Sequence, residues 1–355
     1  MKKLTAWLLI MGLLLGCLGM ASAETKIEPD MDYTVTEDRW TTVLNPVQEG
    51  ISPLTGLPCT EAYTPIALVI DNSPETYPHW GIAEASWIFQ APLNREGGTR
   101  LLALYGDEYP EQAGGARSGR MTLLPLAAAF NAAFAYVGNP PTDEPAISVG
   151  KWLTEWNYRK PTRHYDLEGI HYKERVDFVQ SPQNLSAHVK EIHEDLVKRE
   201  VPFEVRAYLF AENPLDRGED ATEIELVFRD LDEGTTQNYN SNCRFDYREG
   251  IGYTRTSKAG QLAERNTGDP VTFANVIVLR APVLIDHGYV CYEKQLMGSG
   301  QADIFQNGKY IKGAWIRSAR MGRLVFLDDQ GEELKLQPGK TFVVVGNDRV
   351  EVSYQ

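Results

Sequence analysis

The first half of the chain contains compact apolar runs and two stretches with helical character. Three of the apolar runs are typical of short buried strands, namely 64–72, 85–93 and 99–106. The alanine-rich stretch 124–137 predicts a helix. We expect this helix to begin near Met121 to Leu123, because Pro125 is tolerated only in a first turn.

A second helix is predicted over 181–201. Ser181 is suited to cap it, and Pro182 is suited to its first position. The apolar residues that follow recur at spacings of four, three and four, which predicts one buried face.

After about residue 205 the pattern changes to strand-like runs separated by turn residues such as Asn307-Gly308 and Pro338-Gly339. This change predicts an α+β protein. Its N-terminal α/β domain, with a mixed sheet, would cover 52–203. Its C-terminal domain, β-rich and mostly antiparallel, would cover 204–355.

The first 23 residues have the pattern of a signal peptide, with two lysines before a short apolar run. The run ends in Leu14-Leu15-Gly16-Cys17, which resembles a bacterial lipobox, so we expect Cys17 to be lipidated. Ala21-Ser22-Ala23 is a rival site, and cleavage there would give a secreted protein. Residues 24–51 are predicted to be a polar tether. The expected location is extracytoplasmic, with a lipid anchor in the cell membrane.

The formal net charge of −14 excludes a broad nucleic-acid-binding surface, because phosphate binding needs basic excess. After lipidation of Cys17, three cysteines remain in an oxidising compartment. We expect a disulfide between Cys243 and Cys291, with Cys59 unpaired; three buried, unpaired thiols are the alternative. No spacing of cysteine and histidine resembles a zinc site, and we expect no metal and no cofactor.

The stretch from Arg95 to Arg120 concentrates arginine and glycine in an acidic chain. The expected ligand-binding residues here are Arg95, Gly98, Arg100, Arg117, Ser118 and Arg120. Guanidinium groups bind phosphate and carboxylate through paired hydrogen bonds, and glycine lets the backbone approach a ligand closely. The sequence therefore predicts an anion site. The alternative is that the arginines pair with the nearby acids Glu96, Asp107, Glu108 and Glu111.

Asp71 and Asn72 follow the first predicted strand. Functional groups in α/β folds commonly lie at such strand ends, so we include both residues in the candidate site. The alternative is that they cap a turn.

A set of spaced motifs resembles the YerB-like lipoproteins, a bacterial family of unknown function. The motifs are PLTGLP, IALVIDNSP, EGGTR, GGARSGR, LEGI, SPQNL, FANVIVL, QNGKYIKGAW and LQPGKTFVVV. The resemblance covers about residues 52–345 and implies an N-terminal α/β domain joined to a β-rich domain. The chain departs from the family pattern at Gln90, where the family usually has an acid. It also lacks the family's histidines near Tyr136–Asn139 and Gln183.

Three hypotheses for function follow. The first is an envelope lipoprotein that binds an anionic envelope component through the arginines. The second is an envelope enzyme that acts on a phosphate-bearing glycan or lipid intermediate, with Asp71 as a base or metal ligand. The third is a structural scaffold that binds a protein partner. An enzyme requires Asp71 within hydrogen-bond reach of the arginines, whereas a scaffold does not.

Overall fold

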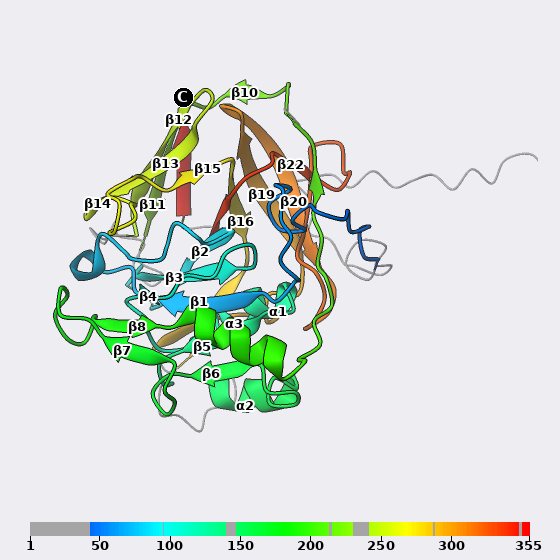
Figure 1. Ribbon diagram of the computed structural model, residues 1–355. Helices are drawn as coiled ribbons and strands as arrows, with labels where there is room; N and C mark the ends of the chain where they lie inside the picture. The colour runs from blue at the N-terminus through cyan, green and yellow to red at the C-terminus, as the bar shows by residue number, and fades with distance from the viewer. Residues whose placement is uncertain are drawn as a thin grey trace, which may run out of the picture.

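The computed structural model describes residues 43–94, 96–139, 147–212, 215–229, 241–286, 288–347 and 350–355 (Figure 1). The predicted signal peptide, Cys17, most of the tether and Arg95 lie outside the described residues. Within the described ranges, no helix is both long enough and apolar enough to span a membrane.

A large mixed sheet forms the centre of the molecule (Figure 1). Among the described residues it has eleven strands, in the order β10-β20-β19-β16-β23-β2-β3-β1-β5-β6, with β21 paired to β20. Their bounds are β1 Ile66–Ile70, β2 Trp87–Pro92, β3 Thr99–Tyr105, β5 Ala133–Tyr136, β6 His164–Asp166, β10 Glu219–Asp220, β16 Asn275–Arg280, β19 Gly298–Gln306, β20 Lys309–Arg317, β21 Val325–Leu327 and β23 Thr341–Gly346.

Smaller sheets surround the central one. A six-stranded sheet contains β11 Glu223–Phe228, β12 Cys243–Arg248, β13 Gly252–Ser257, β14 Gly260–Gln261, β15 Thr272–Phe273 and β24 Val350–Tyr354. Three smaller sheets consist of β4 Ala113–Gly114 with β8 Leu185–Ala187 and β7 Lys173–Arg175, of β17 Val283–Asp286 with β18 Tyr289–Tyr292, and of β9 Leu209–Phe210 with β22 Lys335–Leu336. The prediction of an α+β fold with a mixed N-terminal sheet and antiparallel C-terminal sheets is confirmed.

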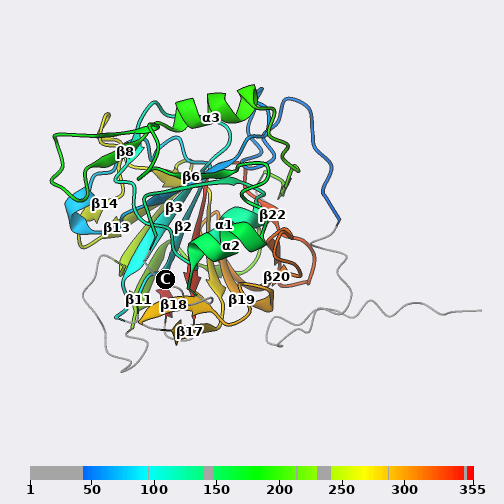
Figure 2. The same cartoon turned by 90° about the horizontal axis from the view of Figure 1, so that it is seen from below.

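The central sheet is buried on both faces, and alternation along its strands divides the core into two clusters. In the described part of the chain, the α-helices are α1 Leu124–Ala129, α2 Val149–Glu155 and α3 Val189–Lys198, with a 3-10 turn at Pro74–Thr76. Helices α1 and α2 contribute to one cluster, and α3 and the six-stranded sheet contribute to the other. Figure 2 shows α1 and α2 together, apart from α3.

The central sheet crosses the predicted domain boundary near residue 203. Strand β2 from the first half pairs in parallel with β23 from the second, with Phe89 opposite Val343. The two halves therefore share one hydrogen-bonded sheet and both of its core clusters.

The predicted helix over 124–137 is wrong in its second half. Helix α1 ends at Ala129, Asn131 adopts a positive φ of 54°, and the chain continues as the buried strand β5. Alanine favours helices in isolation, but β5 pairs in parallel with both β1 and β6, and this pairing overrides local propensity.

The predicted helix over 181–201 begins later than expected. Leu185–Ala187 forms strand β8, and α3 begins at Val189. Leu185 is buried, as the apolar pattern predicts, but it belongs to a strand and not to the helix.

No disulfide joins Cys243 and Cys291. Cys243 begins β12 and belongs to the core cluster on the α3 side of the central sheet. Cys291 lies in β18 and belongs to the cluster on the α1 side. The prediction of a disulfide between them is wrong, because the two thiols belong to core clusters on different faces of the central sheet.

Candidate functional site

Three of the predicted arginines, Arg100, Arg117 and Arg120, lie at the carboxyl ends of the parallel strands β1 and β5. Here the segment 115–119 is inserted between the two strands. The backbone N–H of Arg117 donates to the carbonyl of Val69 at 3.0 Å, and the N–H of Val137 donates to the carbonyl of Arg117 at 2.9 Å. Ligands in α/β folds bind where neighbouring strands separate at their carboxyl ends, and segment 115–119 occupies such a point.

Strand register brings Asp71 close to Arg100. Strands β1 and β3 are antiparallel, and Ile70 lies opposite Leu101. The next pair in this register is Asp71 and Arg100. Alternation directs both side chains to the face of the sheet that α1 covers, because Val69 and Leu102 contribute to the core on that face.

The side chains of three arginines gather around this point. The Nε atom of Arg117 lies 2.9 Å from Oδ2 of Asp71. An Nη atom of Arg100 donates to the carbonyl of Ser118 at 3.1 Å, and an Nη atom of Arg120 donates to the carbonyl of the preceding residue at 2.8 Å. We call Asp71, Arg100, Arg117, Ser118 and Arg120 the arginine site.

The arginine site holds more positive charge than its own carboxylate neutralises. Burial and the charges of Arg120 and Arg117 together lower the pKa of Arg100 to about 9, against the opposing effect of Asp71. Burial also lowers the pKa of Arg120, as does Arg117. The buried Nε atoms of Arg100 and Arg120 have no hydrogen-bond partner. The three guanidinium groups therefore disfavour one another's charge.

Among the acids that the alternative names, Asp107 and Glu111 are engaged elsewhere, and Glu108 lies at another site. Asp107 accepts hydrogen bonds of 2.6 Å from two hydroxyls of the turn 52–55. Glu111 pairs with a surface lysine, and Glu108 lines a separate pocket with Lys340. Asp71, which the alternative did not include, forms an ion pair with Arg117.

Two of the predicted site residues lie apart from the arginines. Asn72 follows Asp71 but projects to the opposite face, where its Nδ2 atom donates to Thr99 Oγ1 at 2.8 Å and its Oδ1 atom accepts from the Tyr77 hydroxyl at 2.9 Å. The N–H of Gly98 donates to a side-chain oxygen within the β2–β3 turn. Both residues stabilise local structure.

Two residues of this region were not anticipated from the sequence. The guanidinium carbon of Arg120 lies 5.9 Å from the ring centre of Tyr289, within the range of a cation–π contact. A ring nitrogen of the fully buried His79 lies 2.7 Å from the carbonyl of Asp71. Burial lowers the pKa of His79 to about 4, so this histidine is neutral near pH 7 and supports the backbone of Asp71. Both residues are brought there by tertiary structure, and no local motif marks them.

Comparison with known proteins identifies a solved structure and a curated protein that are similar to this chain. The chain matches the crystal structure of the YerB protein from Bacillus subtilis with a TM-score of 0.68 and 24% identity, over 85% of this chain and 99% of that one. Among curated proteins it is 25% identical over 297 residues to "Putative lipoprotein YerB" of Bacillus subtilis (strain 168), covering 82% of this chain and 85% of that protein.

Two family models match the chain. Residues 54–202 match the N-terminal domain, and residues 235–343 the C-terminal domain, of the family described as Protein of unknown function (DUF3048). Together these matches cover more than half of the chain. The protein belongs to this YerB-like family, and the resemblance inferred from the spaced motifs is confirmed. Among the described residues, no group of three or more His, Cys, Asp or Glu side chains could hold a metal ion.

Proposed function

We propose that this protein is a lipid-anchored protein of the cell envelope that binds an anionic, phosphate-bearing envelope component at the arginine site. The lipobox at Cys17 and the name of the Bacillus subtilis relative support the anchor. The positive charge at the carboxyl ends of β1 and β5 supports the ligand class.

One observation carries the proposal. Arg100 is 5% exposed, and its charge is disfavoured both by burial and by two neighbouring arginines. A fold gains nothing from such an arrangement unless something else stabilises the charge, and groups with strongly shifted pKa values concentrate at functional sites. A phosphate group would relieve the repulsion among the three guanidinium groups and accept charge-assisted hydrogen bonds from them.

Inorganic pyrophosphate is a direct probe of the arginine site. We expect it to bind the purified protein in isothermal titration calorimetry. Arg117→Gln should weaken this binding by about tenfold or more, because a hydrogen bond to a charged group contributes about 1.5–3 kcal/mol. Arg117 is the most suitable position because its side chain is 27% exposed. The variant leaves the buried carboxylate of Asp71 without its ion pair, so circular dichroism is used to verify that it is folded before the titration.

The matched control is Arg175→Gln, which removes an exposed arginine from β7, outside the arginine site. It should bind pyrophosphate as the unmodified protein does. Equal binding by Arg117→Gln, or equal loss in the Arg175→Gln control, would exclude a specific anion site here.

The enzyme hypothesis also has one specific observation in its favour. Asp71 lies within hydrogen-bond reach of the arginines, since 2.9 Å separates its Oδ2 atom from Arg117 Nε. If the protein cleaves a diphosphate, farnesyl diphosphate should release phosphate or pyrophosphate in its presence. Asp71→Asn should abolish that release and leave the binding of inorganic pyrophosphate in place. Binding without turnover in the unmodified protein favours the binding function alone.

A further inference from the structure

A second group of arginines lies at the opposite end of β5. There a pocket of about 490 Å³ is lined by residues that include Asn131, Trp156, Arg163, Phe203, Arg206 and Met321. Such a volume falls within the roughly 300–1,000 Å³ typical of small-molecule sites. We call it the Arg163 pocket. Asn131 precedes β5, whereas the arginine site lies beyond the last residue of that strand, so the two sites are separate.

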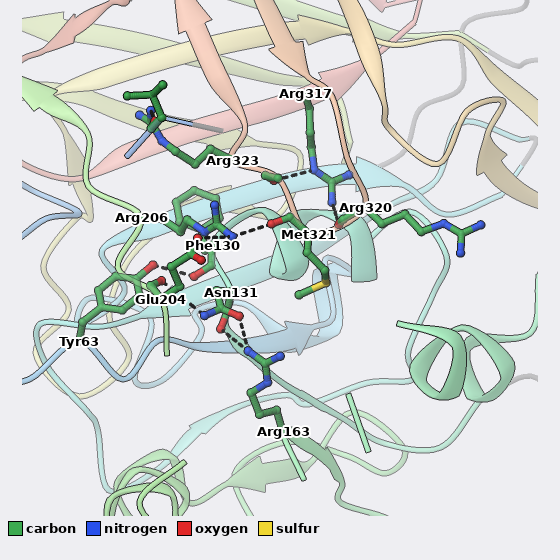
Figure 3. Close-up of polar contacts among 12 residues, drawn as sticks. Tyr63, Phe130, Asn131, Arg163, Glu204, Arg206, Arg317, Arg320, Met321 and Arg323 are labelled. Carbon is green, nitrogen blue, oxygen red and sulfur yellow. Dashed lines mark hydrogen bonds and ion pairs between the residues drawn. The ribbon is translucent and has the colours of Figure 1, made fainter. Parts of the chain in front are cut away.

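The Arg163 pocket is built from segments that are distant in the sequence. Asn131 contacts two of them, the segment that carries Arg163 and the segment that carries Glu204. Its positive φ directs the chain out of α1 toward β5, a conformation that asparagine tolerates. Its main-chain and side-chain oxygens both accept from an Nη atom of Arg163, and its Nδ2 atom donates to the carbonyl of Glu204 at 3.4 Å. Figure 3 shows Asn131 between Arg163 and the segment that carries Glu204 and Arg206.

Both arginines of the pocket are buried and only partly neutralised. Arg206 donates to the carbonyl of Met321 at 2.6 Å and pairs with Glu204 at 2.8 Å. Arg163 stacks near the Tyr158 and Phe203 rings, at 5.4 and 6.0 Å from their centres, and has no ion pair with a carboxylate in the described part of the chain. The Nε atoms of both arginines are buried without a hydrogen-bond partner.

A third guanidinium adds to the positive charge behind the pocket. The fully buried Arg317 donates to backbone carbonyls of the loops around it, including that of Arg320, and Arg206 donates to the neighbouring carbonyl of Met321 (Figure 3). Burial raises the pKa of the Tyr158 hydroxyl, whereas the charges of Arg163, Arg317 and Arg206 act in the opposite direction. All three arginines are therefore close enough to act on one buried, unpartnered hydroxyl.

We propose that the Arg163 pocket binds a small organic anion of sugar size that carries a phosphate or a carboxylate group. Arg163 and Arg206 would hold the oxyanion, because guanidinium groups donate paired hydrogen bonds to such groups. The pocket is larger than an inorganic ion needs, and the Phe203 and Met321 side chains offer apolar surface to the rest of the molecule. Glu204 is the internal competitor, since its carboxylate already pairs with Arg206.

The test uses the full protein with Arg117→Gln as background, so that the arginine site contributes little to binding. Glucose 1-phosphate, glucuronate and neutral glucose are titrated, and binding is followed by the NMR signal of the Trp156 indole N–H, assigned with Trp156→Phe. Trp156 lines the pocket, and its indole N–H is buried without a hydrogen-bond partner, so its signal responds to changes at this pocket. We expect a saturable shift with at least one of the two anions and none with glucose.

Two variants make the outcome decisive. Arg163→Gln should weaken binding by about tenfold or more, as for loss of one charge-assisted contact, and the exposed Arg159→Gln should not. Glu204→Gln should tighten binding severalfold, because it removes the competing carboxylate. The Glu204 side chain is 52% exposed, so this variant should fold even if Arg163→Gln does not. No saturable shift with either anion, equal response to glucose, or unchanged or weaker binding by Glu204→Gln would overturn the proposal.

Discussion

Arg100 and Arg323 are both buried, yet their surroundings are opposite. Arg323 lies in the second half of the chain and is 1% exposed. It pairs with the buried carboxylate of Glu333, and its Nη atoms donate to the carbonyls of Ala207 and Val43 at 3.1 Å. Arg100 is nearly as buried, but its neighbouring charges are two arginines and the carboxylate of Asp71, which pairs with Arg117.

The difference separates a structural arginine from a candidate functional one. Arg323 connects the chain near residue 43, the segment at 207 and the loop that carries Glu333. The carboxylate of Glu333 neutralises its charge. Within the described ranges, the guanidinium group of Arg100 donates to one main-chain carbonyl, that of Ser118. Burial alone therefore does not show what an arginine does, and the partners of its guanidinium group do.

The largest expected effect is a loss of stability when the structural arginine, Arg323, is replaced. Arg323→Ala should lower the free energy of unfolding by about 3–5 kcal/mol, because it leaves the carboxylate of Glu333 without its charged partner and with only the Asn45 amide donating to it. Urea denaturation followed by circular dichroism measures this loss. Pyrophosphate binding at the arginine site should persist under native conditions.

An exposed ion pair provides the control for that measurement. Arg229 pairs with Glu351 at 2.6 Å, and both side chains are at least one-third exposed. Arg229→Ala should cost less than about 1 kcal/mol, because solvent screens exposed pairs. If both variants lose the same stability, burial of the Arg323–Glu333 pair does not set its contribution.

A smaller effect of opposite sign is expected at the arginine site. Arg100→Gln should raise the free energy of unfolding by about 1 kcal/mol at pH 7, since it removes a charge that burial and two arginines disfavour. The same variant should bind pyrophosphate more weakly. A loss of stability as large as that of Arg323→Ala would show instead that Arg100 is structural, and the ligand hypothesis would then lose its main support.

The sequence predicts much of the fold because its strands carry local signals. The run 64–72 contains β1, and the run 99–106 contains β3. The apolar pattern fails where pairing partners are distant: Ala133–Tyr136 is an internal strand of the sheet although its alanines favour a helix. A single sequence does not reveal that β1 and β6 will flank this segment.

The candidate site is predictable in composition but not in geometry. Arginines and glycines in 95–120 are visible in the sequence, and so is Asp71 after a strand. Asp71 lies opposite Arg100 only because β1 pairs with β3. Strand β2 lies between these two strands in the chain, so the sequence does not show this pairing. The sequence likewise gives no sign that Asn72 projects to the other face. There it belongs to a closed ring of hydrogen bonds formed by Asn72, Thr99, Ser241, Gln90, Arg255 and Tyr77.

That ring contains a third kind of buried arginine, one whose partners include a neutral side chain. Arg255 is fully buried, and its Nη atoms donate to the Tyr77 hydroxyl and to Gln90 Oε1, each at 2.8 Å. Gln90 in turn donates from Nε2 to the carbonyl of Ser241 at 2.8 Å. Gln90 is also the position at which the family pattern usually has an acid.

The smallest expected effect comes from restoring that acid. Gln90→Glu would place a carboxylate against the Arg255 guanidinium and would lose the donor to the Ser241 carbonyl, so the net gain in stability should be about 1 kcal/mol at pH 7. Burial at position 90 raises the pKa of a carboxyl group, and the charge of Arg255 lowers it; we expect Arg255 to dominate, so that the folded-state pKa lies below the unfolded value. The gain should therefore be present above about pH 4.3 and disappear as the pH falls through the folded-state pKa. Urea denaturation from pH 7 to pH 3 measures it. Gln90→Leu is the control, because it removes both hydrogen bonds and should destabilise at every pH. If Gln90→Glu behaves like Gln90→Leu, the Ser241 contact outweighs the charge of Arg255, and the neutral ring is the better solution for this chain.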